Sequence, residues 1–289
     1  MKSAYNESCT LQNAALEQEL LLYEQAGFDY IELRIDKLRD YLRTHTRDEL
    51  QSFFRKNRLK PYAMIGMHAY KTLFAADDDP HRQEAFLIDF RFGCEILCAI
   101  GARDMVIVPP LFTEDTGKVY DEPWEQRLAD NVRIFTYLSA LARDYDVRLD
   151  IKIIDAPRCS VRTVEGCNAI LDAVGQSNVG YTRDPFNFYM VEKDDSFASL
   201  SALRPERIFV VHVCGAEGKT LLQSDRTYPD EGVMNVENYL KALRAHGYDG
   251  PVSLDISREE EWGKRPERVI ARAAAAMKSI LPDSRHINQ

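Results

Sequence analysis

DVRLDIKIIDAPRCSVRTVEGCNAILDAVGQSNVGYTRDPFNFY, residues 146–189, contains the clearest structural pattern in the chain. Apolar residues predict a strand over 149–154 and a helix over 163–174, and a second strand then runs into Asp184. In a parallel β-α-β unit the carboxyl ends of the two strands lie on the same edge of the sheet. We therefore expect Lys152, late in the first strand, and Asp184, just after the second, to share the edge where function resides.

The same alternation of strand and helix extends through the whole chain. The predicted strands cover 3–6, 30–34, 62–67, 104–108, 148–154, 179–181, 208–213 and 252–256, and the predicted helices cover 13–26, 47–55, 81–100, 125–143, 163–174, 196–203, 236–245 and 266–280. Eight such pairs without a linker rich in Pro, Gly or Ser predict a single (β/α)8 TIM barrel, one domain over residues 1–289. The alternative is a doubly wound open sheet, but that fold is typically marked by a G-x-G-x-x-G turn, which the sequence lacks.

Composition narrows the range of partners. The chain has 289 residues, 45% of them hydrophobic, and a formal net charge of −9. This charge argues against binding of nucleic acid or an anionic membrane, because both need clustered Lys and Arg. The first residues contain acids within their apolar stretch and no run of secretory or membrane-spanning length, so we expect a cytoplasmic protein. The six cysteines are scattered through a chain with ample apolar residues, and we expect them to be reduced.

Chemistry in a TIM barrel is carried by polar residues at the carboxyl ends of the strands. In this chain they are Glu32, Arg34, His68, Lys152, Asp184, Asn187, His212, Asp255 and Arg258. Asp184, His212 and Asp255 form an acid–histidine–acid series on consecutive strands, a set of ligands that suits Mn²⁺ or Zn²⁺. The alternative for His212, which lies between apolar residues, is a packed and hydrogen-bonded core histidine.

Several stretches, in this order and spacing, resemble a known family along nearly the whole chain. They are YNESCTLQNAALEQELLLYEQAGFDYIELRIDKL, PRCSVRT, NVGYTRDPFNF, ERIFVVHVCG and SDRTYPDEGVMNVENYLKALRAHGYDGPVSLDI. The family is that of the sugar isomerases and epimerases with a xylose-isomerase-like barrel, and the resemblance is greatest to its keto-inositol (inosose) isomerases. It implies a TIM barrel that acts on a small sugar or polyol ketone.

The resemblance also implies a metal site. In that family a divalent ion is held by a glutamate ending the fifth strand, an aspartate ending the sixth, a histidine ending the seventh and a glutamate ending the eighth. Asp184 and His212 match this pattern, and Asp255 supplies a shorter carboxylate at the eighth strand. The fifth-strand glutamate aligns with Lys152. The departures from the pattern thus concern the metal site itself.

Lys152 argues against an ordinary metal site. An ammonium group has no lone pair to offer, and its repulsion of a dication at ~4 Å costs about 8 kcal/mol at an effective dielectric near 20. Two neighbouring positions also depart, since Asn187 stands where the family usually has a histidine and Cys214 where it has an acid. We therefore expect Lys152 to replace the cation, in an ion-paired cluster with Asp184 and Asp255. We expect no other cofactor than the family's Mn²⁺, Zn²⁺ or Mg²⁺.

Three functions remain open at this point. In the first, an isomerase or epimerase, Lys152 and His212 stabilise an enediolate oxygen while Asp255 or Asp184 moves a proton between adjacent carbons. In the second, Lys152 forms a Schiff base with a carbonyl, as in lyases and aldolases. In the third, the barrel has lost catalysis and binds a sugar-like ligand or a partner.

Further polar residues are candidates for contact with the substrate. They are Glu32, Arg34, Arg183, Asn187 and Arg226. Glu32 and Arg34 share a strand face, so they pair with each other or contact the substrate. Arg226 matches the DR pair that precedes the YPDEG loop in the family.

The expected partner is a small sugar or polyol ketone, and related barrels often form homodimers. The superfamily also includes a metal-dependent DNA-repair endonuclease. That function is excluded by the acidic net charge and by the missing metal ligands.

Overall fold

Eight parallel strands form a closed barrel in the computed structural model, which describes residues 1–112, 117–154, 156–192, 195–218, 223–256 and 258–281. The barrel order is β1-β10-β7-β6-β5-β4-β3-β2, as a (β/α)8 fold requires. The barrel strands are β1 (Lys2–Asn6), β2 (Tyr30–Arg34), β3 (Lys60–His68), β4 (Asp104–Val108), β5 (Arg148–Lys152), β6 (Val179–Arg183), β7 (Ile208–Val213) and β10 (Pro251–Leu254). The prediction of a TIM barrel is confirmed.

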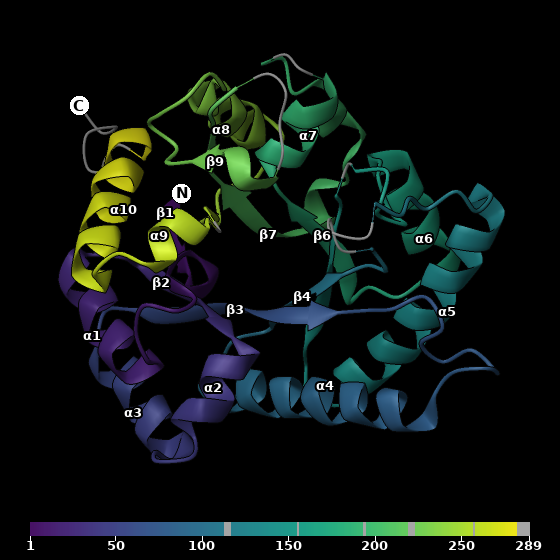
Figure 1. Cartoon of the computed structure of the whole chain (residues 1–289), viewed down its shortest axis with the longest axis horizontal. Coiled ribbons are helices and arrows are strands. Elements are labelled where there is room, and N and C mark those ends of the chain that lie inside the picture. Colours follow the sequence, from purple (N-terminus) through teal and green to yellow (C-terminus); the bar gives the residue numbers. More distant parts are fainter. Residues whose placement is uncertain (113–116, 155, 193–194, 219–222, 257, 282–289) are drawn as a thin grey trace. The chain divides into compact units, whose positions relative to one another are not determined.

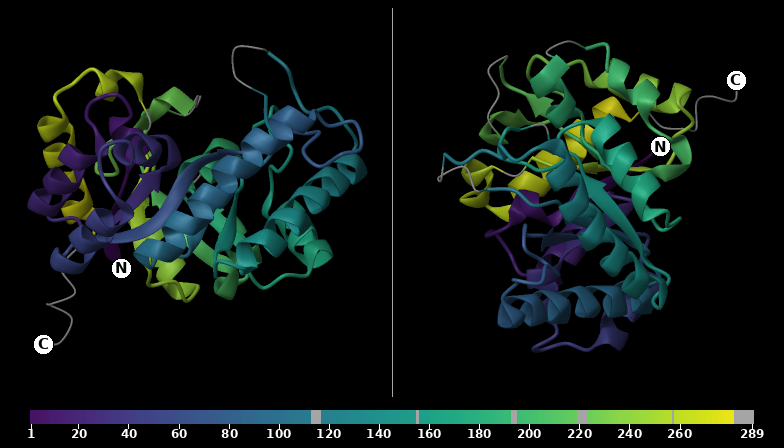
Figure 2. Two further views of the ribbon diagram at one scale, coloured as in Figure 1. Left: turned by 90° about the horizontal axis from the view of Figure 1, so that it is seen from below. Right: turned by 90° about the vertical axis from the view of Figure 1, so that its right-hand side faces the viewer.

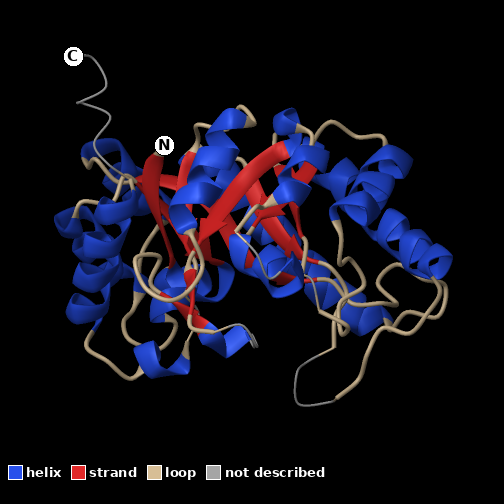
Figure 3. Cartoon of the chain, turned by 90° about the horizontal axis from the view of Figure 1, so that it is seen from above, coloured by secondary structure: helices blue, strands red, loops and turns tan. Residues whose placement is uncertain are grey.

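Helices follow the strands and lie outside them (Figure 3). They are α1 (Leu16–Ala26), α2 (Ile35–Tyr41), α3 (Arg47–Lys56), α4 (Pro80–Ile100), α5 (Trp124–Arg143), α6 (Val164–Val174), α7 (Pro185–Glu192), α8 (Val236–Ala245), α9 (Glu259–Trp262) and α10 (Pro266–Ile280). A short hairpin of β8 (Gly215–Ala216) and β9 (Arg226–Thr227) follows β7. Among the described residues, no helix is both long and apolar enough to cross a bilayer.

The structure divides into two compact units. One comprises Met1–Tyr62, Asp184–Leu200 and Val211–Gln289, and the other comprises Ala63–Arg183 and Ser201–Val210. In the first unit β1 pairs in parallel with β2 and β10, and α1 packs beside α10 (Figure 1). In the second unit β4, β5 and β6 pair in parallel, and α5 packs beside α6 (Figure 2). A single domain over 1–289 stays a prediction.

Local sequence signals explain where several helices begin and end. The Thr46 side chain accepts a hydrogen bond from the Glu49 N–H, and the Glu49 carboxylate accepts one from the Thr46 N–H, which forms a capping box at the start of α3. Thr163 caps α6 in the same way through the Gly166 N–H. Gly175 ends α6 at φ +64°, in the left-handed region that glycine adopts without steric cost.

Some predicted elements differ from the structure. The predicted helix 196–203 is a 3-10 helix, Ala198–Ala202, because Phe197 precedes it at φ +47°, where an α-helix cannot continue. The predicted strand 148–154 ends at Lys152, since the Ile154 N–H donates to the Val161 carbonyl in a turn. The three short helices α2, α7 and α9 were not predicted.

Candidate active site

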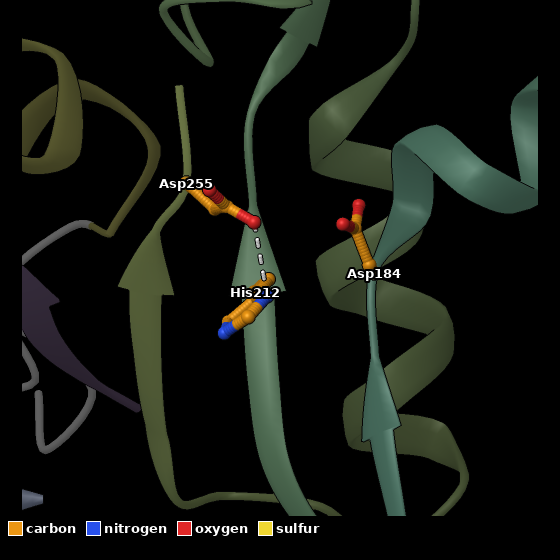
Figure 4. A group of neighbouring side chains, drawn as sticks. All are labelled: Asp184, His212 and Asp255. Atoms are coloured by element: carbon orange, nitrogen blue, oxygen red, sulfur yellow. Dashed lines mark ion pairs between the residues drawn. The ribbon is translucent and has the colours of Figure 1, made fainter. Parts of the chain in front are cut away.

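Asp184, His212 and Asp255 lie together at the carboxyl ends of three strands (Figure 4). Asp184 directly follows β6, His212 lies near the end of β7, and Asp255 directly follows β10. All three are buried, and each offers one ligand atom within 4.8 Å of the other two. The parallel register of β7 and β10 explains why His212 and Asp255 lie close together. His212 is the Cα partner of Ser253, and the Asp255 N–H donates to the Val213 carbonyl. The strand ends thus bring two carboxylates and one imidazole to a common point.

The His212 imidazole lies between two carboxylates. Its Nε2 is 3.0 Å from Oε1 and 3.1 Å from Oε2 of Glu32, and its Nδ1 is 3.2 Å from Oδ2 of Asp255. The Ser253 hydroxyl donates to Oε2 of Glu32 over 2.7 Å. Glu32, His212 and Ser253 are fully buried. A buried carboxylate needs hydrogen-bond donors, and Glu32 takes them from the imidazole and the hydroxyl.

Arg226 provides a positive charge within this site. Its guanidinium forms a two-pronged ion pair with Asp184, with Nη2–Oδ2 at 2.7 Å and Nη1–Oδ1 at 3.3 Å. It also donates to the Asp255 carbonyl at 3.2 Å and lies 3.4 Å from the Cys214 sulfur. Burial lowers the pKa of Arg226, but the charges of the Asp184 and Asp255 carboxylates outweigh burial and raise it. Arg226 is therefore a permanent cation.

The β8–β9 hairpin positions this arginine. Arg226 is the first residue of β9 and pairs with Ala216 of β8, and its guanidinium lies over the ring of Phe186, 4.5 Å from the centroid. Gly232 closes the following loop at φ +85°, where the Val233 N–H donates to the Ala216 carbonyl. A side chain at Gly232 would overlap that carbonyl. The loop geometry thus explains why the YPDEG stretch ends in glycine.

The donor atoms fit a divalent cation. Two carboxylates and an imidazole are ordinary ligands of Zn²⁺. A carboxylate on the second nitrogen of the imidazole, here Glu32, is the usual means of orienting a metal-binding histidine. The guanidinium of Arg226 opposes binding, since it neutralises Asp184 and repels a dication. The site therefore has the ligands for a metal and a competing positive charge.

Three other predicted site residues lie on β5, β6 and α7. Lys152 is the half-buried last residue of β5, and its Cα partner is Thr182, two residues before Asp184. Arg183 ends β6 and Asn187 lies in the first turn of α7, and both are fully buried. The expected cluster of Lys152 with Asp184 and Asp255 stays a prediction.

The predicted pairing of Glu32 with Arg34 is wrong. Glu32 accepts from His212 and Ser253, whereas the Arg34 guanidinium binds the Asp36 carboxylate at 2.9 Å and the Ser8 hydroxyl at 3.1 Å. The reason is that Glu32 is fully buried while Arg34 is only partly covered at the end of the strand.

Sequence reasoning missed three contacts of the site. Ser253 was not considered, and neither the Glu32–His212 contact nor the Asp184–Arg226 ion pair was expected. Alternation within VSLDIS gives a weak signal for Ser253, because it shares a strand face with Asp255. The two pairs have no local signal, because their partners are far apart in the chain.

Comparison with known proteins agrees with this fold. The model of the xylose isomerase-like TIM barrel family matches residues 20–280. The inosose isomerase of Halalkalibacterium halodurans is 32% identical over 277 residues, which cover 94% of each chain. The inosose isomerase of Bacillus velezensis is 30% identical over 285 residues, which cover 97% of each chain.

Solved structures show the same similarity. A crystal structure of the IolI protein with a bound zinc atom has a TM-score of 0.84 and 29% identity, covering 97% of this chain and 98% of that one. A crystal structure of D-psicose 3-epimerase has a TM-score of 0.75 and 18% identity, covering 98% of this chain and all (100%) of that one, and supports the fold alone. On this evidence, the chain belongs to the xylose isomerase-like TIM barrel family.

Proposed function

We propose that this protein is an isomerase or epimerase that acts on a sugar or a keto-polyol, with a substrate related to the inososes. The main support is the buried group of Asp184, His212 and Asp255 at the carboxyl ends of the barrel strands, in a chain about 30% identical to curated inosose isomerases. An acid–histidine–acid group of this kind can bind a carbonyl and move a proton beside it.

The proposed reaction passes through an enediolate. A carboxylate removes the proton from the carbon next to the carbonyl, the C–H electron pair forms a C=C bond, and the carbonyl oxygen becomes an oxyanion. In an isomerisation the hydroxyl proton of the deprotonated carbon moves to this oxyanion, the former carbonyl carbon takes up a proton, and the new carbonyl forms at the neighbouring carbon. In an epimerisation the same carbon is reprotonated on its opposite face and the original carbonyl forms again. Lys152 is proposed to donate a hydrogen bond to the oxyanion.

Asp255 is the better candidate for the proton-transferring base. Both oxygens of Asp184 accept hydrogen bonds from Arg226, which stabilises the carboxylate and weakens it as a base. The Asp255 carboxylate lies farther from Arg226, at 3.8 Å, and 3.2 Å from Nδ1 of His212, which can take up the proton that Asp255 removes. Asp184 and Arg226 are then assigned to hold the substrate hydroxyl groups.

A divalent ion, if bound, would be held by Asp184, His212 and Asp255 and would polarise the substrate carbonyl as a Lewis acid. We propose that this site is weaker than that of relatives with a fourth carboxylate, because Lys152 supplies a charge instead of a ligand and Arg226 competes for Asp184. Location in the cytoplasm and pairing as a homodimer also stay proposals.

Deuterium exchange tests the proposal. The protein is incubated in D₂O with keto-inositols and ketoses, with and without added Zn²⁺ or Mn²⁺, and deuterium next to the carbonyl is measured by NMR. We expect incorporation above the protein-free rate, and its loss in Asp255→Asn. Absence of incorporation with every candidate would contradict the proposal, and mass addition after borohydride treatment would indicate a Schiff base on Lys152 instead.

A further inference from the structure

Glu32 is placed to control the orientation of His212. Its two carboxylate oxygens lie 3.0 and 3.1 Å from Nε2 of the imidazole, and the Ser253 hydroxyl donates to it from the register partner of His212. The three side chains come from β2, β7 and β10 and are fully buried. The contact is therefore a fixed part of the barrel interior.

This contact decides which ring nitrogen faces the cluster. A carboxylate accepts but does not donate, so Nε2 of His212 must carry the proton that lies between it and Glu32. Nδ1, 3.2 Å from Asp255, then points to the point shared with Asp184. The two ring contacts differ in alignment, because Nε2 meets hydrogen-bond geometry with both oxygens of Glu32, whereas the 3.2 Å contact of Nδ1 with Asp255 does not. With the proton on Nδ1 instead, the buried Glu32 carboxylate would lose its aligned donor, which is unfavourable.

The same geometry directs Glu32 to His212 and not to the substrate, because its oxygens already receive the imidazole and hydroxyl donors. We propose that Glu32, supported by Ser253, is a positioning residue that holds His212 in the Nε2–H form with Nδ1 presented to Asp184 and Asp255. This replaces the expectation that Glu32 binds the substrate. The effect on turnover rests on the proposed function, whereas the effect on the imidazole does not.

The tautomer can be read directly by NMR. The chain has six histidines, few enough for their ring ¹⁵N signals to be resolved, and the His212 signals are identified by their loss in His212→Gln. We expect a proton on Nε2 in the wild-type protein. In Glu32→Gln the anionic acceptor at Nε2 is removed while the Asp255 carboxylate stays 3.2 Å from Nδ1, so the proton should move to Nδ1. Ser253→Ala, which keeps the Glu32 contact, should retain the Nε2–H form.

Metal affinity and kinetics give two further readouts. Loss of such an orienting carboxylate should weaken Zn²⁺ binding about 10–100-fold. Turnover should show a lower kcat with an unchanged KM, since Glu32 does not contact the substrate. Glu261→Gln is the matched control, a buried glutamate bonded to Tyr228 and Lys264 and outside this cluster, and it should leave the His212 signals unchanged.

The outcomes separate the two proposals. An unchanged Nε2–H signal in Glu32→Gln overturns the positioning role, and so does a raised KM with unchanged kcat, which would indicate substrate binding. If Glu32→Gln does not fold, Glu32→Asp takes its place, since the shorter carboxylate must weaken the Nε2–H signal, and an unchanged signal overturns the role. A shifted tautomer without deuterium exchange on any substrate would refute the proposed function alone.

Discussion

Removal of the Arg226 guanidinium tests the charge balance of the site. Arg226→Met keeps most of the volume of the side chain but leaves Asp184 buried with its two-pronged partner removed. Breaking a buried ion pair from one side costs about 3–5 kcal/mol, because the remaining charge stays desolvated. At roughly 2–4 °C per kcal/mol for a chain approaching this size, the midpoint of thermal unfolding should fall by roughly 6–20 °C.

The free energy of unfolding is measured by urea denaturation, with Arg272→Met as the matched control. Arg272 also forms a two-pronged ion pair, with Asp230 at 2.7 and 3.0 Å, but it is about one-third exposed, so its loss should cost no more than about 1 kcal/mol. Adding Asp184→Asn to Arg226→Met should recover stability, because the orphaned charge is then gone. Equal losses in Arg226→Met and Arg272→Met, or no recovery in the double variant, would refute the reasoning.

Three other changes test separate features. Lys152→Glu should raise the affinity for Zn²⁺, measured by calorimetry, because it restores a carboxylate and removes a positive charge. An unchanged Zn²⁺ affinity would mean that the end of β5 does not face the cluster. In Glu7→Gln the unfolding free energy at pH 7 should exceed that of the wild type and equal it near pH 4. Burial, followed by the charge of Glu19, raises the pKa of Glu7 above its ordinary 4.5, so the folded state holds the proton more tightly and wild-type stability falls as pH rises from about 4.5; parallel pH curves would contradict this. Gly232→Ala should lower the free energy of unfolding, measured by urea denaturation, by roughly 1–3 kcal/mol, because φ is +85° and a Cβ would overlap a carbonyl. The control is Gly218→Ala, where a Cβ meets nothing within 4 Å, and it should be near neutral. Equal losses in the two variants would speak against strain at Gly232.

The barrel could be predicted because its strands are locally marked. Tyr30–Arg34, Asp104–Val108 and Ile208–Val213 agree with the predicted bounds, since each is a short apolar run between turn residues. The short helices were missed for the opposite reason. In α7, which begins at Pro185, there is no clear periodicity, and the acids that open α9 are as typical of a solvated loop as of a helix start.

The position of the site was predictable and its internal contacts were not. Strand order alone places Asp184, His212 and Asp255 at one end of the barrel. The partner of each depends on side-chain direction across strands, and Glu32 and His212 are separated by 180 residues. Arg226 lies on the two-residue strand β9, which is too short for a periodic pattern to indicate which way a side chain points.

The positive charge that pairs with Asp184 is carried by the β8–β9 hairpin and not by a barrel strand. The charge of this site can therefore change through substitutions that leave the barrel strands unchanged. Exchange of that hairpin between relatives would remove or restore one fixed cation while every barrel strand keeps its pairing. The charge beside Asp184 is therefore set by a short hairpin and not by the strands that close the barrel.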